Sequence, residues 1–493
     1  MQSRFLMPPF AGRPAAVCLA LIFFAMLMAR APFLFYIGMS TDAYNNGLDL
    51  PPYDFLASQG RQGSYVMIRL LSGLGIYGPH LQFLNVALGI AALSVASFYL
   101  FRTVFPHSRL AIFTGSLLFL AHPYQSEIIT FRDAFPFYAV ATMAGCCGYY
   151  LTGSVDRRRL LSGTFLIVAG LTIYQSFVNF LAMAWLLQAV LVMLLPAYRE
   201  RDPNWQRRLM QRAGSVTAAM AIYLVLIKAL NHLQGTAVAG RATLISIEEI
   251  PERAGAVLLV FKQLIRVDLI ASAPLASALI AMLVLSALIL MLVRGEGYWR
   301  FVAVPAFAVL LLFFSVGLIS VGKDFWPMPR TLVAAALIPA FAACILLELA
   351  RSALFFRSIA ITSSIILVAY VGLGTRVAVD QVRINQRDAL FAATIAARVP
   401  LPPGIHLAIV GGPNNALGLS TVRGDMNISA YWAHWSKVEA VSEYLGYRIA
   451  NPTEQQWDMS RAYCASPDVE TWPGDTSVST IGDGHVTICL SKP

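Results

Sequence analysis

Acidic and basic side chains beside apolar segments are the residues of this chain whose types and positions suggest chemistry. The first polar loop contains Asp42, directly after an apolar run, and Arg61 further along. Because a carboxylate near lipid is costly, its presence suggests a function, and Asp42 is a candidate general base for an acceptor hydroxyl. The alternative is that Asp42 caps a helix beginning there. Arg61 is a weaker candidate for binding an anionic group.

The second polar loop places two acids and a guanidinium close together in the sequence. Glu127 and Asp133 are further candidate catalytic acids, and Arg132 lies directly before Asp133. The planar guanidinium of arginine donates two parallel hydrogen bonds to phosphate, so Arg132 is a candidate phosphate ligand. The alternative is that Arg132 and Asp133 only neutralise charges at the membrane interface.

Three residues outside these loops complete the candidate set. Tyr174 and Gln175 could bond sugar hydroxyls, or could satisfy backbone groups freed at a helix break. Arg330 begins an apolar segment, where it could hold a phosphate or anchor the helix among lipid head groups. Lys228 lies in another apolar segment, and we interpret it as a side chain that extends to the interface.

The elements that must position these residues are membrane helices. Hydrophobic residues make up 58% of the 493 residues and charged residues 13%, compared with about 25% charged in a soluble domain. A soluble core could not bury so much apolar surface, so we predict an all-α polytopic membrane protein. Its predicted spans are the eleven apolar segments 15–37, 80–101, 110–121, 135–152, 160–175, 176–196, 213–232, 270–293, 300–321, 331–350 and 358–375.

Two of the predicted segments are unusual in their length. The uncharged stretch 160–196 would extend about 55 Å as one helix, nearly twice a hydrocarbon core of about 30 Å, so we expect a break near Tyr174 and Gln175. The first segment follows Arg4 and Arg13, as in a signal peptide. Because its apolar run is longer than a signal peptide's and no small-residue cleavage site follows, we predict a retained anchor.

Arginine-rich loops give the predicted orientation. The clusters lie at Arg102 and Arg109, 157–159, 199–212, Arg294 and Arg300, and Arg351 and Arg357. In an eleven-span chain all of them fall on one side, which the positive-inside rule makes cytoplasmic, together with the N-terminus. The candidate site residues and the C-terminal region then lie on the opposite side. The net charge of +10 is therefore a topology signal, and we expect no nucleic-acid partner.

A change of composition divides the chain into two predicted domains. We predict a transmembrane domain over 1–375 and a small α/β domain over 376–493, with strands at 405–411 and 485–491 and helices near 380–398 and 436–446. Cys464 and Cys489 in this tail could pair only outside the cytoplasm. No spacing of cysteine or histidine suggests a metal site.

Taken in order, these motifs resemble the Gtr-type serotype-converting O-antigen glucosyltransferases, which are similar to the wider GT-C class of polytopic transferases. The resemblance is best from Thr41 to about Arg132: an acid in the first outer loop, then Gly-Arg, then Pro-Tyr, Glu and Phe-Arg-Asp. It extends to Tyr174-Gln175, Arg330 and the polar tail. The family usually has paired acids in the first loop, whereas this chain has Thr41-Asp42. Whether Asp42 acts alone, or with Glu127 or Asp133, is left open.

The resemblance implies a transferase of the bacterial inner membrane whose periplasmic site uses a sugar, expected to be glucose, on polyprenyl phosphate. The implied acceptor is O-antigen or another surface glycan, and the implied partners include proteins that make or flip the donor. Asp42 would act on the acceptor hydroxyl, while Arg132 and Arg330, with Arg61 as a weaker candidate, would stabilise the departing phosphate. We expect no cofactor: some GT-C enzymes use a divalent metal, but no ligand cluster supports one here.

Three other functions compete with this one. A flippase or transporter of lipid-linked sugars predicts internal repeats and polar residues deep in several segments, and the sequence shows neither clearly. An O-antigen polymerase or ligase predicts a large outer loop, whereas the loop at 233–269 is modest. A receptor or assembly protein would bind glycans through the C-terminal tail. The polar groups gather on one side of the membrane, which favours the transferase.

Overall fold

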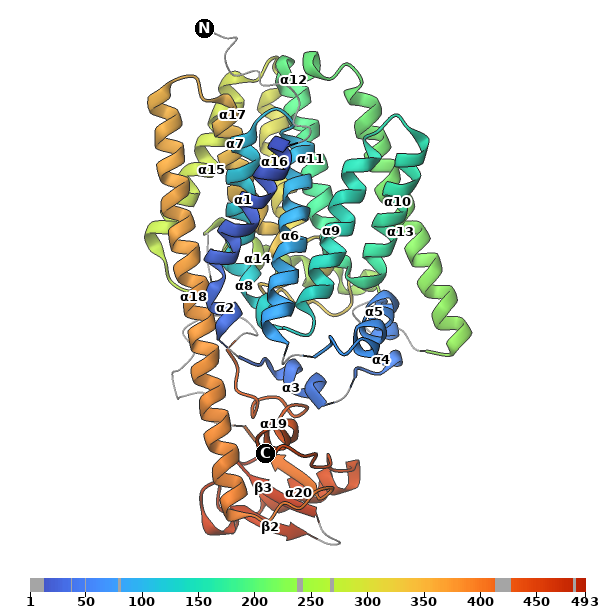
Figure 1. The fold of residues 1–493 in the computed structure, drawn as a ribbon, viewed down its shortest axis with the longest axis vertical. Coiled ribbons are helices and arrows are strands. Elements are labelled where there is room, and N and C mark those ends of the chain that lie inside the picture. The colour runs from blue at the N-terminus through green and yellow to red at the C-terminus, as the bar shows by residue number, and fades with distance from the viewer. Residues whose placement is uncertain are drawn as a thin grey trace.

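The computed structural model describes residues 13–36, 38–48, 50–78, 81–236, 243–266, 270–412, 427–481 and 485–493, so Arg4 lies outside the described residues. Helices make up 73% of the structure, as predicted for a mostly helical protein. They form an upright bundle, and the C-terminal part of the chain forms a lobe beneath it (Figure 1).

Each of the eleven predicted apolar segments overlaps one helix of the bundle. These helices are α1 (Arg13–Ala29), α6 (Gln82–Val104), α7 (Arg109–Ala121), α9 (Phe135–Thr152), α10 (Arg157–Ile173), α11 (Val178–Leu194), α13 (Trp205–Gln234), α15 (Pro274–Arg294), α16 (Arg300–Val316), α17 (Leu337–Leu349) and α18 (Ala353–Arg398). Within the bundle, α9 packs against α6 and α10, and α17 packs against α7 and α15.

Five helices of the described chain are long and apolar enough to cross a membrane, judged by length and composition. They are Gln82–Val104, Gln175–Leu194, Trp205–Gln234, Pro274–Arg294 and Ala353–Arg398. Four shorter apolar helices, Pro14–Ala29, Arg109–Ala121, Arg300–Val316 and Val333–Leu349, accompany them. These findings support a membrane protein, but they do not confirm the predicted count of eleven spans.

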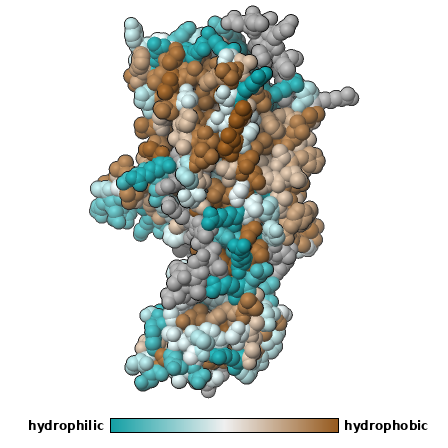
Figure 2. Space-filling view, turned by 90° about the vertical axis from the view of Figure 1, so that its left-hand side faces the viewer, coloured by the Kyte–Doolittle hydropathy of each residue, from teal (hydrophilic) through white to brown (hydrophobic). Residues whose placement is uncertain are grey.

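The outer surface of the bundle suits a lipid environment. Apolar side chains cover much of its flank, whereas hydrophilic ones gather at its upper end and over the lobe (Figure 2). Phe24 of α1 and Val368 of α18 are examples of large apolar side chains left exposed. Because exposed apolar surface of this extent is unusual in a soluble protein, it is consistent with contact to lipid.

The predicted helix break is present, and the structure adds another. Helix α10 ends at Ile173, a short 3₁₀ helix η1 (Gln175–Phe177) follows, and α11 begins at Val178. The first apolar segment is also broken, because α1 ends before Arg30 and α2 (Ala31–Phe35) follows. Arg30 is 1% exposed and donates to Ser126 Oγ at 2.6 Å. Arg30 was not among the candidate site residues.

Further helices, most of them short, lie between the helices of the bundle and mainly in the polar loops. They are α3 (Thr41–Leu48), α4 (Tyr53–Ser58), α5 (Gln62–Gly73), α8 (Pro123–Thr130), α12 (Pro196–Arg201), α14 (Ile250–Ile265), η3 (Ile247–Glu249), η4 (Gly317–Ser320) and η5 (Val333–Ala336). Figure 1 shows α3, α4 and α5 between the bundle and the C-terminal lobe.

The basic loops meet at the end of the bundle away from the lobe. Ion pairs join Arg199 to Glu296 at 3.7 Å and Arg201 to Glu348 at 3.1 Å, so three of the predicted clusters lie together. Helix α18 begins at this end and runs past the rest of the bundle into the lobe (Figure 1). The predicted domain boundary at 375/376 falls inside this continuous helix.

The lobe is a small α/β unit, which we call the tail domain and which comprises the end of α18 and the chain after it. Its sheet has the order β1-β3-β2, with β1 (His406–Val410) parallel and β2 (Val478–Ile481) antiparallel to β3 (His485–Cys489). Helices α19 (Lys437–Leu445) and α20 (Glu454–Ala465) and the 3₁₀ helix η7 (Asp475–Ser477) complete it. The predicted strands and helices are present; α20 and β2 were not predicted.

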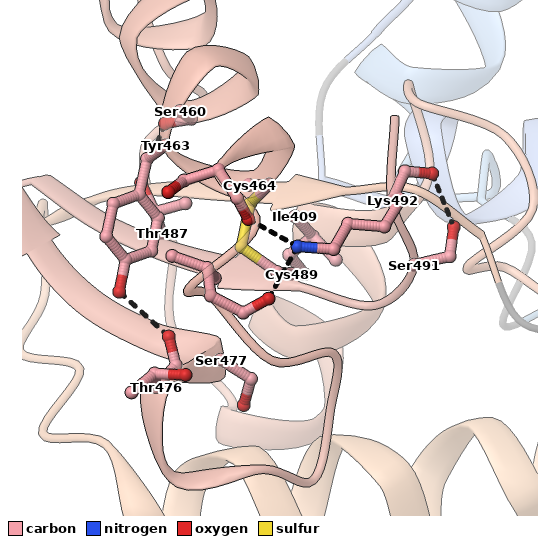
Figure 3. The surroundings of a disulfide bond; sticks show 12 residues. Ile409, Ser460, Tyr463, Cys464, Thr476, Ser477, Thr487, Cys489, Ser491 and Lys492 are labelled. Carbon is pink, nitrogen blue, oxygen red and sulfur yellow. Dashed lines mark hydrogen bonds between the residues drawn. A yellow bond between two sulfur atoms is a disulfide. The ribbon is translucent and has the colours of Figure 1, made fainter.

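A disulfide between Cys464 of α20 and Cys489 of β3 ties the tail domain together (Figure 3). Beside it, Lys492 Nζ donates to the carbonyl oxygens of Ser466 and Val469, at 2.5 Å each. These contacts fix the end of the chain against the loop that follows α20. The two cysteines therefore form the pair that the sequence allowed for a tail outside the cytoplasm.

Candidate active site

A cavity of about 1410 Å³ lies at the end of the bundle that faces the tail domain. Its lining comes from the short helices α3, α4 and α5, the loop between α8 and α9, the break between α10 and α11, the end of α13, and the segment that precedes η5. Segments far apart in the sequence therefore meet where the bundle ends.

The cavity brings most of the predicted site residues together. The candidates that line it are Asp42, Arg61, Asp133, Tyr174, Gln175 and Arg330. Glu127 and Arg132 do not line it. Both are nearly or wholly buried, at 0% and 3% exposure, and their contacts show that each holds another part of the site in place.

Asp42 lies in the first turn of α3, on the cavity wall. The alternative to a chemical role was a capping role. The hydroxyl of Ser40 takes that position, because it accepts a hydrogen bond from the backbone N–H of Ala43 at 3.2 Å. A serine oxygen that accepts from the amide three residues on is the usual helix cap. The Asp42 carboxylate is therefore not needed to cap α3.

Glu127 binds Arg330 at the cavity edge. Its carboxylate accepts from the backbone N–H of Arg330 at 2.5 Å and from the Arg330 guanidinium at 3.1 Å. The guanidinium also lies over the ring of Phe131, 4.4 Å from its centre. The side chain of Arg330 remains 15% exposed while that of Glu127 is 0% exposed. Glu127 thus orients a cation that reaches the cavity.

Arg132 points away from the cavity, although its two neighbours line it. Phe131 and Asp133 face the cavity, whereas Arg132 donates from Nη2 to the carbonyl oxygen of Tyr36 at 2.7 Å. Tyr36 directly follows α2, shortly before the segment that carries Asp42. Arg132 therefore fixes the backbone segment that leads to Asp42 and does not contribute a cation to the cavity.

Arg61, Tyr174 and Gln175 form one unit on another wall. The Arg61 guanidinium lies over the Tyr174 ring, 4.6 Å from its centre. Gln175 Nε2 lies 3.0 Å from the carbonyl oxygen of Gly60 and 2.6 Å from the hydroxyl of Tyr223. The glutamine amide therefore fixes the turn that presents Arg61. Gln175 thus binds backbone groups, as one of the two predictions for it stated, and also lines the cavity.

Several polar residues of the cavity were not predicted as site residues. Lys228 and His232 of α13, and Asp324 and Trp326 before η5, all line the cavity. Lys228 had been interpreted as reaching the membrane interface. A signal was available, because the polar side chains of Lys228 and His232 are four residues apart and so lie on one face of α13.

The charge of the cavity is mixed. Arg61, Lys228 and Arg330 supply three cationic side chains. The acidic side chains are those of Asp42, Asp133 and Asp324. Cations of this kind suit a phosphate, while carboxylates suit a hydroxyl that must lose a proton. Within the described ranges, no group of three or more His, Cys, Asp or Glu side chains is arranged to hold a metal ion.

Comparison with known proteins identifies the family. The model of the family described as glucosyl transferase GtrII matches residues 31–347, nearly two thirds of the chain. No curated protein was found to match. The matched region contains all eight predicted site residues and ends before α18. The chain therefore belongs to the GtrII glucosyl transferase family, whose members act as glycosyltransferases.

Proposed function

We propose that this protein transfers glucose from a polyprenyl-phosphate donor to an O-antigen or similar surface glycan, in the cavity on the periplasmic side of the inner membrane. The observation that carries the proposal is the composition of the cavity wall. It combines three cationic side chains with Asp42 and Asp133, in the part of the chain that matches the family.

The chemistry needs two kinds of side chain. The acceptor hydroxyl oxygen forms a bond to the anomeric carbon of the sugar while the bond from that carbon to the phosphate oxygen breaks. The electron pair leaves with polyprenyl phosphate, where cations placed in advance stabilise the added charge. The hydroxyl proton passes to a carboxylate, for which we propose Asp42, assisted by Asp133. Arg330, Arg61 and Lys228 are the proposed phosphate ligands.

A lipid-linked donor fits the position of the cavity. Leu224 and Val225 line it and are also 58% and 70% exposed, on the outer side of α13. The cavity wall is therefore continuous with apolar surface that suits lipid. We propose that the phosphate and sugar of the donor enter here, while the polyprenyl chain stays in the bilayer.

Two observations support the periplasmic side. The arginine-rich loops gather at the end of the bundle away from the tail domain, and such loops face the cytoplasm in membrane proteins. The tail domain carries the disulfide between Cys464 and Cys489, and disulfides persist in oxidising compartments. Because the cavity lies on the tail side, both observations support a cavity outside the cytoplasm.

The test is transfer in a defined system. The purified full chain in lipid vesicles would receive polyprenyl-phosphate glucose and lipid-linked O-antigen, and the product would be detected as a hexose-sized mass gain. Asp42→Asn should lower the rate by about 100-fold or more, as expected for loss of a general base. Asp133→Asn should lower it less.

The matched control is Asp458→Asn, because Asp458 is an exposed tail residue whose ion pair with Arg461 lies at the surface, and the variant should keep the wild-type rate. No product from the wild-type protein with any acceptor would refute the proposal. Movement of the donor between leaflets without product would instead indicate a flippase.

A further inference from the structure

The helix that carries Asp42 is built into the core of the tail domain. Met39, Ala43 and Tyr44 are at most 8% exposed, and they belong to the same apolar cluster as Val438 of α19 and Ile409 of β1. Helix α3 also packs directly against α19. In Figure 1, α3 lies at the junction of bundle and lobe, above α19. One face of α3 therefore belongs to the tail domain while Asp42 lines the cavity.

Two amides of α18 hold the backbone just before α3. Asn385 Oδ1 accepts from the backbone N–H of Met39 at 2.7 Å, and Asn385 Nδ2 donates to the Met39 carbonyl at 3.0 Å. Gln381 Nε2 donates to the same carbonyl at 2.8 Å. Asn385 Nδ2 also lies 3.3 Å from the Tyr44 hydroxyl. Both polar groups of the Met39 backbone are thus fixed by a segment more than three hundred residues away.

The same stretch of α18 is fastened to the tail domain. Gln381 Oε1 accepts from the backbone N–H of Asn427 at 2.9 Å. Two turns further along α18, Asp388 accepts from the Ser429 hydroxyl at 2.5 Å and from the backbone N–H of Ala430 at 2.8 Å. Gln381 therefore bridges the tail domain and the Asp42 segment with its two amide atoms.

Close packing leaves this segment little freedom to shift. A side-chain carbon at Gly38 would lie 2.8 Å from Gln381 Cγ, closer than such contacts normally occur. On the side of the bundle, Arg132 holds the Tyr36 carbonyl. The approach to Asp42 is therefore held by the bundle at Tyr36 and by α18 at Met39.

We propose that Gln381 and Asn385 are positioning residues for Asp42, and that the tail domain acts through them to set the place of this carboxylate in the cavity. They lie in α18, beyond the matched family region, which ends at residue 347. A displacement of about 1 Å at a reacting group can lower a rate by about 100-fold. The proposal rests on the proposed function because it takes Asp42 to act on the acceptor.

The test uses the full chain in nanodiscs with polyprenyl-phosphate glucose and lipid-linked O-antigen. Asn385→Leu keeps the size of the side chain but removes both bonds to Met39, and Asn385→Asp keeps the acceptor for the Met39 N–H. We expect Asn385→Leu to lower kcat at least tenfold while the KM for the donor changes less than twofold. Asn385→Asp should recover part of the lost kcat. Thr394→Ala, an exposed position of the same helix, is the matched control and should match wild type.

Hydrogen exchange separates this proposal from the proposed function. Amides of residues 38–44 should exchange at least tenfold faster in Asn385→Leu than in wild type or Thr394→Ala, whether or not the chain transfers glucose. Unchanged exchange would overturn the positioning role, and so would faster exchange with an unchanged kcat. An inactive wild-type protein with the expected exchange pattern would refute the proposed glucose transfer and leave the attachment of α3 to the tail domain standing.

Discussion

Glu127 and Arg330 illustrate how a buried residue can matter to a site it does not line. The carboxylate is wholly buried and binds both the backbone and the guanidinium of Arg330. A buried charge that loses its partner remains unpaired in a medium of low dielectric constant, which makes breaking a buried pair costlier than removing it whole. Glu127 is therefore expected to affect activity through Arg330.

We expect Glu127→Gln and Arg330→Gln each to destabilise the folded protein by about 3 kcal/mol or more. The double variant should be more stable than the Arg330→Gln single variant, because it removes the buried carboxylate together with the guanidinium that it binds. Thermal unfolding of the four proteins in nanodiscs measures this coupling. Additive losses in the double variant would show that the two side chains act independently.

Asp388 gives the attachment of the tail domain a pH dependence. It lies past the apolar part of α18, where it packs against the tail domain, and burial raises its pKa to about 6 from 3.8 although Ser429 and Ala430 donate to it. Because the folded protein favours the protonated form, this contribution is full below about pH 4 and is lost as the pH rises through 6. The total loss is at most about 3 kcal/mol.

Unfolding temperature measured from pH 4 to pH 7.5 should therefore fall more steeply for wild type than for Asp388→Asn. The asparagine keeps an acceptor for Ala430 and can donate to the Ser429 oxygen, so it separates the charge from the hydrogen bonds. Parallel curves for the two proteins would contradict the assigned role of Asp388.

Residue types alone pointed to some residues of the candidate site and not to others, and the reasons are physical. Asp42 and Arg330 were found because charges near lipid are costly and therefore conspicuous. Arg132 has the same conspicuous charge, but its direction depends on how the loop between α8 and α9 turns, which spacing does not reveal. Lys228 was missed as a site residue because a lysine near a helix end equally suits the interface.

At the scale of elements, the turn between α4 and α5 positions Arg61. Gly60 has a φ of 72°, in the left-handed region that favours glycine, and a side-chain carbon there would lie 2.5 Å from the Tyr223 hydroxyl. Gly75 has nearly the same φ, 69°, but nothing lies within 4 Å of the corresponding point. Substitutions at Gly60 and Gly75 therefore distinguish the cost of backbone strain, present at both, from that of a steric clash, present only at Gly60.

Gly60→Ala should lower both stability and glucose transfer, whereas Gly75→Ala should cost only the backbone strain of about 1 kcal/mol and keep its activity. Unfolding temperature and transfer rate, measured side by side, test this. Equal losses in the two variants would show that contact with Tyr223 does not matter.

The long helices could be predicted because apolar runs of sufficient length leave few alternatives. The break at Tyr174 followed from length alone. The short helices α3, α4 and α5 lack such a signal, and α3 owes its position to contacts with α18 and α19 that are remote in the sequence. Periodicity reports local structure, so it could not reveal that the tail domain and the Asp42 segment share one core.

At the scale of the whole molecule, the disulfide offers a test of the proposed periplasmic side of the tail domain. In cells, full-length protein denatured and alkylated without reduction should react at Cys18, Cys146, Cys147 and Cys344, and two further sites should react after reduction. Cys464→Ser with Cys489→Ser should abolish that difference and cost about 3 kcal/mol of tail stability. Six reactive cysteines before reduction would contradict a periplasmic tail.

Helix α18 also has a consequence for the reach of the molecule. Its 46 residues rise about 69 Å, while the hydrocarbon core is about 30 Å thick, so more than half its length extends beyond that core. Because α18 is one continuous helix, its length sets how far from the bilayer the tail domain lies. The glycan of the proposed lipid-linked acceptor would have to fit beneath that height, so the length of α18 would limit how large a glycan can approach the cavity.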